Sequence, residues 1–200
     1  MKTLLFITAS ILLTGNLFAQ KGYQVNDAAS DFELKNVDGQ MVSLAGLKDA
    51  KGAIVIFTCN HCPFSVAYED RIIELNKMFS YQGFHVVAIN SNDAEAYPED
   101  SYENMQIRAR QKGFQFVYLY DETQAIARKY GAMRTPHVFV LRKVGDKFVV
   151  AYIGAIDDNT NEPDLVKQKY VENAVNAILK GEEVKPNFTK AVGCSVKYKK

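Results

Sequence analysis

The sequence predicts a single α/β domain in which helices cover both faces of a largely parallel central sheet, preceded by an N-terminal hairpin. The alternation of two kinds of segment along the chain favours this fold class. Short apolar runs rich in β-branched residues alternate with segments whose apolar residues recur at helical spacing. Strands that alternate with helices in this way are typical of parallel sheets with helices packed on both sides.

The elements are expected in the following order. The alternating residues 31–34, a turn at Asp38-Gly39 and a returning segment 41–44 indicate the opening hairpin. A buried strand at 53–57 is followed by a helix that begins at Pro63 and ends before Gly83. The remaining expected strands are 84–89, 116–119, 137–141 and 148–153, and the remaining expected helices are 98–112, 123–130 and 161–179. The last residues form a basic, extended tail.

Composition narrows the class of function. The chain has 200 residues, of which 48% are hydrophobic and 24% are charged, as in an ordinary globular protein. Its 24 basic and 23 acidic residues nearly cancel. This balance argues against nucleic acid or an anionic membrane as the main partner.

The first 19 residues have the features of a signal peptide. Lys2 provides the positive charge, an apolar run covers 4–13, and Ala19 precedes the expected cleavage before Gln20. A buried N-terminal helix is one alternative. A permanent membrane anchor is another, but none is expected, because the apolar run is shorter than the ~20 residues of a spanning helix. The prediction is an exported protein, periplasmic or secreted. Its one domain covers 20–200, with a core at about 28–180 and a tail at 181–200.

The chain has three cysteines, Cys59, Cys62 and Cys194, too few for a disulfide scaffold. Cys59 follows a buried strand, and Cys62 precedes the proline that begins a helix. The start of a helix stabilises a thiolate, and two intervening residues let one sulfur attack a substrate while the other resolves the mixed disulfide. We therefore expect Cys59 to be a solvent-facing nucleophile and Cys62 to be the resolving cysteine.

Other interpretations of the cysteines remain open. The pair Cys59 and Cys62 is also compatible with half of a zinc site, an inert disulfide or coincidence, although no second cysteine pair exists. Cys194 is either a third redox cysteine that pairs with Cys59 in some state, or a free thiol on a C-terminal strand.

Four segments together resemble the redoxin branch of the thioredoxin superfamily, which includes the alkyl hydroperoxide reductase/thiol-specific antioxidant type. The resemblance covers about 28–179. It is carried by the segments Phe57-Thr58-Cys59-Asn60-His61-Cys62-Pro63-Phe64, Ala88-Ile89-Asn90-Ser91-Asn92-Asp93, Asp121-Glu122-Thr123 and Arg134-Thr135-Pro136-His137-Val138-Phe139. It implies a thioredoxin-like fold and thiol–disulfide exchange with protein thiols or disulfides and a redox partner, without a cofactor or metal.

The resemblance also implies roles for residues around the cysteines. Pro136 takes the place of the cis-proline that lies opposite the CxxC motif, and Thr135 would offer its backbone to a substrate strand. Asn60 and His61 stand between the cysteines, where they would contact substrate and tune the thiols. A histidine before the second cysteine resembles the oxidising DsbA-type motif, and a cationic His61 would stabilise the Cys59 thiolate. A loop histidine without a tuning role is the alternative.

The sequence departs from its relatives at the expected proton acceptor. Ala53 stands where thioredoxin has a buried aspartate, and Ser65 stands where membrane-tethered reductases have a glutamate. The proton acceptor for Cys62 is therefore not identified, and Asp93 is a candidate only because it follows the end of a strand.

Two other activities are weighed against disulfide exchange. A peroxiredoxin-like peroxidase would use Arg134 and Thr58, but Thr58 is adjacent to Cys59, and Ile56 occupies the position of the peroxiredoxin threonine. A Sco-like copper protein would use the two cysteines and the remote His137, but Sco cysteines have three residues between them rather than two.

Overall fold

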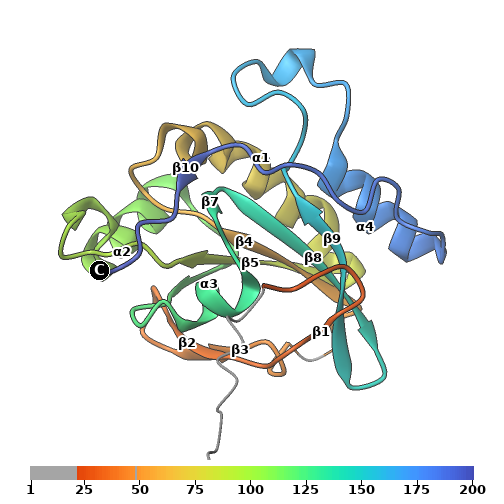
Figure 1. Ribbon diagram of the computed structural model, residues 1–200, viewed down its shortest axis with the longest axis horizontal. Coiled ribbons are helices and arrows are strands. Elements are labelled where there is room, and N and C mark those ends of the chain that lie inside the picture. The colour runs from red at the N-terminus through yellow and green to blue at the C-terminus, as the bar shows by residue number, and fades with distance from the viewer. Residues whose placement is uncertain (1–21, 48) are drawn as a thin grey trace, which may run out of the picture.

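The computed structural model describes residues 22–47 and 49–200 as an eight-stranded sheet with helices on both faces (Figure 1). The expected signal peptide lies outside the described residues. The strand order is β1-β9-β8-β4-β5-β6-β2-β3. The strands are β1 (Ala28–Ala29), β2 (Glu33–Asn36), β3 (Met41–Ser43), β4 (Gly52–Phe57), β5 (Phe84–Asn90), β6 (Val117–Tyr120), β8 (His137–Val144) and β9 (Lys147–Gly154).

The α/β class and the N-terminal hairpin are as expected, but the sheet is mixed. Only β4, β5 and β6 run parallel to one another. β8 pairs antiparallel with β4, the hairpin after β8 adds β9 antiparallel to β8, and β2 joins antiparallel at β6. The strand expected at 137–141 is longer in the structure, because Arg142, Lys143 and Val144 continue its pairing with β9 as a hairpin arm that leaves the core.

Four α-helices pack on the two faces of the sheet. They are α1 (Pro63–Phe79), α2 (Tyr102–Lys112), α3 (Ala125–Tyr130) and α4 (Tyr170–Lys180). Side chains of β4 alternate between the faces, as the period of a strand requires. Ile54 and Ile56 pack with α1 and α4, whereas Val55 and Phe57 pack with α3 and the opening segment. Helix α2 covers β5 and β6 on the same face as α1.

Two expected helices are shorter than predicted. Segment 161–179 becomes helical only from Tyr170, because backbone groups before it hydrogen-bond Asp158 instead: the Lys167 amide donates to the Asp158 carboxylate, and the Gln168 carbonyl accepts from the Asp158 amide. The Arg71 guanidinium donates to the carbonyls of Asn159 and Thr160 and pairs with Asp157 at 2.7 Å. Segment 98–112 begins as a separate 3₁₀ turn at Pro98–Asp100, and Ser101 then caps α2 by accepting from the Asn104 amide.

The tail also differs from expectation, because it forms a second small sheet. Residues Cys194–Ser195 (β10) pair antiparallel with Arg134–Thr135 (β7), just before β8. In Figure 1 the tail crosses above α1 to reach β7, and its last residues then hydrogen-bond Asp93, after β5, and Gln124, before α3. The C-terminal end of the chain therefore lies at the same edge of the main sheet as the ends of β4 and β5.

Candidate active site

The CxxC loop connects the end of β4 to the start of α1. Cys59 lies two residues beyond β4, and Cys62 is the residue that caps α1 ahead of Pro63. The carboxyl ends of parallel strands are where α/β sheets place reactive groups. The loop between the cysteines contains Asn60 and His61, and the Thr135–Pro136 peptide bond lies opposite it and is cis, as the resemblance implied.

Cys59 is a buried free thiol, and the expectation that it faces solvent is wrong. Only 3% of the residue is exposed. Its Sγ lies 3.4 Å from Thr135 Oγ1 and 3.8 Å from Ser65 Oγ. Burial raises the pKa of Cys59, and the negative charge of Asp100 raises it further, against smaller opposing effects of hydrogen bonds from Thr135 and others.

Cys62 forms a disulfide with Cys194. The two Cα atoms lie 6.1 Å apart, within the usual range for a disulfide. Of the two interpretations that the sequence left open, a redox cysteine that pairs with Cys59 and a free thiol on a C-terminal strand, neither describes this bond: Cys194 does lie on the strand β10, but it is bonded to Cys62. Cys62 is fully buried beneath this contact. The second cysteine of the CxxC motif is therefore bonded to the tail, while the first, Cys59, is a free thiol.

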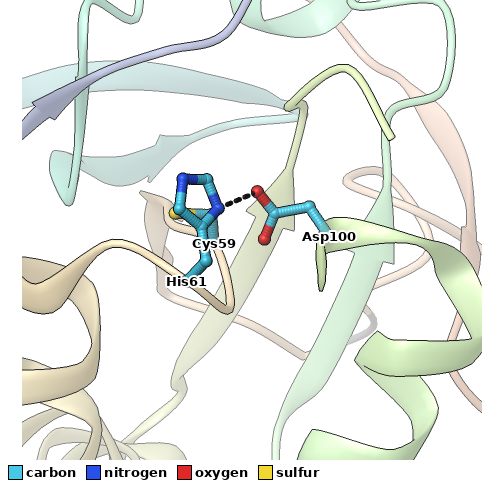
Figure 2. Close-up of side chains that lie close together, drawn as sticks. All are labelled: Cys59, His61 and Asp100. Atoms are coloured by element: carbon cyan, nitrogen blue, oxygen red, sulfur yellow. Dashed lines mark hydrogen bonds and ion pairs between the residues drawn. The ribbon is translucent and has the colours of Figure 1, made fainter. Parts of the chain in front are cut away.

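His61 is held by Asp100 and by an aromatic side chain. Its Nδ1 lies 2.6 Å from Asp100 Oδ2 (Figure 2). Its imidazole is stacked on Tyr97 with the ring centroids 5.3 Å apart. Figure 2 also shows Cys59 behind the imidazole. His61 is thus an ordered residue of the site, rather than a free loop histidine.

Asp100 is the central polar group of the site, and the sequence did not single it out. It is fully buried, and its carboxylate accepts from the Asn60 amide at 2.7 Å and from Asn92 Nδ2 at 2.7 Å. Asn92 Oδ1 in turn accepts from the backbone N–H of Lys197 in the tail. A continuous set of hydrogen bonds therefore joins the tail to the CxxC loop. In the sequence, Pro98-Glu99-Asp100 has the pattern of a helix start, which does not distinguish a buried carboxylate from an ordinary charge in a first turn.

Asn60 has a structural role beside its place between the cysteines. Its side-chain amide donates to the Glu99 carbonyl, and its Oδ1 accepts from the Tyr118 hydroxyl at 2.9 Å. These bonds fix the loop against β6 and the turn before α2, which keeps the two cysteines in place.

The residues considered for peroxide are not assembled around Cys59. Arg134 is exposed and lines the same surface pocket as His137, and within the described residues no hydrogen bond or ion pair joins it to Cys59. Thr58 is buried, and its amide donates to the Ile89 carbonyl across the sheet. Asp93 uses its carboxylate to accept from the Glu95 amide, and within the described residues no hydrogen bond joins it to Cys62.

The copper alternative does not match the ligand positions. Cys59, His61 and Asp100 are the one set of potential metal ligands that comes together in residues 22–47 and 49–200. His137 is not among them, because it lies within β8 and its Nδ1 accepts from the Met133 amide. The Asp100 oxygens already accept three hydrogen bonds, so this set fits a hydrogen-bonded cluster better than a metal site.

Comparison with known proteins gives the following relatives. The model of the AhpC/TSA family matches residues 25–156. An uncharacterized conserved protein from Geobacillus kaustophilus is 38% identical, with a TM-score of 0.81 over 88% of this chain and 93% of the other. A hypothetical protein from Sinorhizobium meliloti is 33% identical, with a TM-score of 0.80 over 90% and 97% of the chains.

More distant structures share the fold. A peroxidoxin, BcpB, from Mycobacterium tuberculosis is 17% identical, with a TM-score of 0.60 over 78% of this chain and 96% of the other. The thioredoxin-like fold is therefore confirmed. None of the curated proteins compared with the chain matches it. Within the described residues, no helix has the length and apolar character needed to cross a membrane.

Proposed function

Since this chain belongs to the AhpC/TSA family it is an oxidoreductase, and we propose that it exchanges disulfides with protein substrates through Cys59, Cys62 and Cys194. One observation carries the proposal. Cys62 is bonded to Cys194 while Cys59, three residues away, remains a free thiol against the cis-proline segment. Cys62 is bonded to Cys194, and the CxxC spacing would also let it bond to Cys59.

The shared sulfur permits an internal exchange of disulfides. The Cys59 thiolate attacks Cys62 Sγ, the Cys59–Cys62 bond forms, and the Cys62–Cys194 bond breaks with its electron pair on Cys194. Cys194 takes up a proton to replace the one that Cys59 loses, so no net oxidation occurs. The dithiol left after reduction by a partner then reduces a substrate disulfide to two thiols and is itself oxidised.

Single-cysteine variants test this proposal. Fully reduced protein is mixed with a small disulfide-bonded protein, and the appearance of substrate thiols is followed. We expect Cys62→Ser to abolish the exchange, because the two cysteines that remain, Cys59 and Cys194, both lose the sulfur with which they would form a disulfide. Ser195→Ala, an exposed neighbour of the disulfide, serves as the matched control and is expected to keep the wild-type rate. Undiminished exchange in Cys62→Ser would contradict the proposal.

We also propose that the protein is exported after removal of residues 1–19. The support is the charged start, apolar run and small residue at position 19 of the sequence. The N-terminal residue of full-length protein produced in a bacterial host tests this, with Gln20 expected. Recovery of the intact chain from the cytoplasm alone would contradict it.

A further inference from the structure

The short strand β7 has one partner within the described residues, and that partner is the chain's own tail. Cys194 lies opposite Thr135 and Ser195 lies opposite Arg134. The pairing continues beyond β10, because the Val196 amide donates to the Met133 carbonyl at 3.2 Å. A peptide that added to β7 would use these same backbone groups, so the tail and such a peptide exclude each other.

The tail also blocks access to the sulfur that it binds. Cys62 has no exposed surface, and Cys59 is buried beside it. A cysteine of another protein therefore reaches Cys62 only when Cys194 leaves. Reduction of the Cys62–Cys194 bond removes the covalent link, and the hydrogen bonds between β10 and β7 then hold the tail in place.

The tail remains attached beyond this segment. The Lys197 carbonyl accepts from the Asp93 amide and from Gln124 Nε2, both at 2.8 Å. The Lys199 amide donates to Gln124 Oε1, and the Tyr198 hydroxyl donates to the Ala132 carbonyl. These contacts lie outside the β7 edge. They keep a detached segment 193–196 close to β7, where it competes with an incoming peptide as an intramolecular partner.

Gly193 shows which kind of residue fits against β7 at the position immediately before the cysteine. A Cβ atom added there would lie 2.7 Å from the Thr135 carbonyl carbon and 3.1 Å from the Pro136 nitrogen. Both atoms belong to the backbone of the cis-proline segment and have little freedom to move. In this register the residue before the cysteine must therefore be glycine.

From these observations we propose that segment 193–196 is a built-in occupant of the partner-binding edge, and that the partner is a protein with an extended Gly-Cys segment. The inference rests on the proposed disulfide exchange. In this proposal the roles that the sequence predicts for the two cysteines are reversed. After reduction, the Cys62 thiolate rather than Cys59 attacks the disulfide of the partner, forms a mixed disulfide and releases the partner's other sulfur as a thiolate. Cys59 or Cys194 then attacks Cys62, which frees the partner as a dithiol and leaves this chain oxidised.

Two peptides test the proposal on a full-length variant in which Cys62 is the one cysteine, Cys59→Ser with Cys194→Ser. The first has the sequence of residues 192–196, and in the second alanine replaces the glycine. Each peptide carries its cysteine as a disulfide with a chromophoric thiol, whose release reports exchange. We expect the glycine peptide to react at least about tenfold faster, because a side chain at this position overpacks the contact with Thr135.

A tail substitution tests the competition. On the same background, Gly193→Ala weakens the tail's own fit and is expected to speed exchange with the glycine peptide several-fold. Val192→Ala, at the exposed neighbouring position, is the matched control and leaves the rate unchanged. Circular dichroism verifies the fold of each variant, and the comparison of the two peptides stands even if Gly193→Ala fails to fold.

The outcomes separate the two proposals. Equal rates for the two peptides would overturn the Gly-Cys partner and leave disulfide exchange intact. If Cys62 reacts with neither peptide nor with oxidised glutathione, the proposed function itself fails.

Discussion

Asp100 holds His61 through a 2.6 Å contact between its Oδ2 and the imidazole Nδ1, and the same carboxylate opposes ionisation of the neighbouring Cys59. One buried negative charge therefore orders the loop between the cysteines and suppresses one of its thiolates. In this oxidised form Cys59 is the one thiol of the chain, since Cys62 and Cys194 are bonded to each other. Its ionisation can be measured without interference from the other two.

Asp100→Asn should lower the pKa of Cys59. The substitution removes the negative charge that raises this pKa, while an amide oxygen remains to accept from the Asn60 amide. Burial, the larger cause of the raised pKa, is unchanged, so the fall is partial. Thiolate absorbance of the oxidised protein against pH measures it. Glu99→Gln, which neutralises the adjacent exposed carboxylate, is the control. A Cys59 pKa that stays constant or rises in Asp100→Asn would refute the electrostatic role.

His61→Pro should make the cysteines more reducing. A histidine held beside the CxxC sulfurs stabilises a thiolate, and so the reduced form, when it carries a proton. Its loss is expected to lower the midpoint potential of the Cys59–Cys62 pair by tens of millivolts. For this two-electron couple ~30 mV corresponds to ~1.4 kcal/mol. Equilibration with glutathione, read by gel shift, gives the potential. His85→Ala, on β5 and away from the cysteines, should leave it unchanged. If the potential of His61→Pro equals that of the wild type, groups other than His61 set the redox potential.

Peroxide turnover should be weak and independent of Arg134. The Arg134 side chain is exposed on the side of His137, and Cys59 has a raised pKa, which reduces the thiolate available to attack peroxide. Rapid-mixing kinetics of reduced protein with hydrogen peroxide should give similar rates for the wild type and Arg134→Ala. A fast reaction that Arg134→Ala abolishes would instead favour a peroxidase.

His137 should make the domain sensitive to acid. Burial, aided by the charge of Arg134, lowers its pKa to about 4, whereas an unfolded chain has a histidine pKa of about 6.5. Below pH ~6.5 His137 binds a proton in the unfolded state but not in the folded state, so the free energy of unfolding falls as the pH drops toward 4. The linked loss of unfolding free energy approaches about 3 kcal/mol.

Denaturant titrations at several pH values measure this loss. His137→Gln keeps an acceptor for the Met133 amide and has no titrating proton, so it should show a shallower dependence between pH 7 and 4. His85→Gln is the matched control. Identical pH profiles for His137→Gln and the wild type would exclude this histidine as the source.

The parts of the fold that the sequence predicts are those whose periodicity is local. β4, α1 and β5 follow from a buried apolar run, a proline at a helix start and a second apolar run. The cis Thr135–Pro136 bond was expected only through the resemblance. β7 and β10 have two residues each, and no pattern of that length distinguishes a strand from a loop. Their existence depends on a contact between segments far apart in the chain.

The same limit applies to the site. The CxxC spacing identifies Cys59 and Cys62, but their exposure depends on the tail and on the loop before α2, which pack over them. The pairing of Cys62 with Cys194 spans 132 positions, so no local rule could select Cys62 over Cys59. Asp100 was missed for a related reason: a single carboxylate in the first turn of a predicted helix looks like an ordinary helix-start charge.

The Cys62–Cys194 bond turns most of the domain into a macrocycle. Oxidation closes a loop of about 130 residues, which by chain entropy alone stabilises the folded state by about 5 kcal/mol. By thermodynamic linkage, folding then favours this disulfide over the dithiol by the same amount. Reduction of the Cys62–Cys194 disulfide therefore also opens this covalent loop. The reduced protein is the form more readily unfolded and digested, so in the presence of proteases its lifetime is set in part by its redox state.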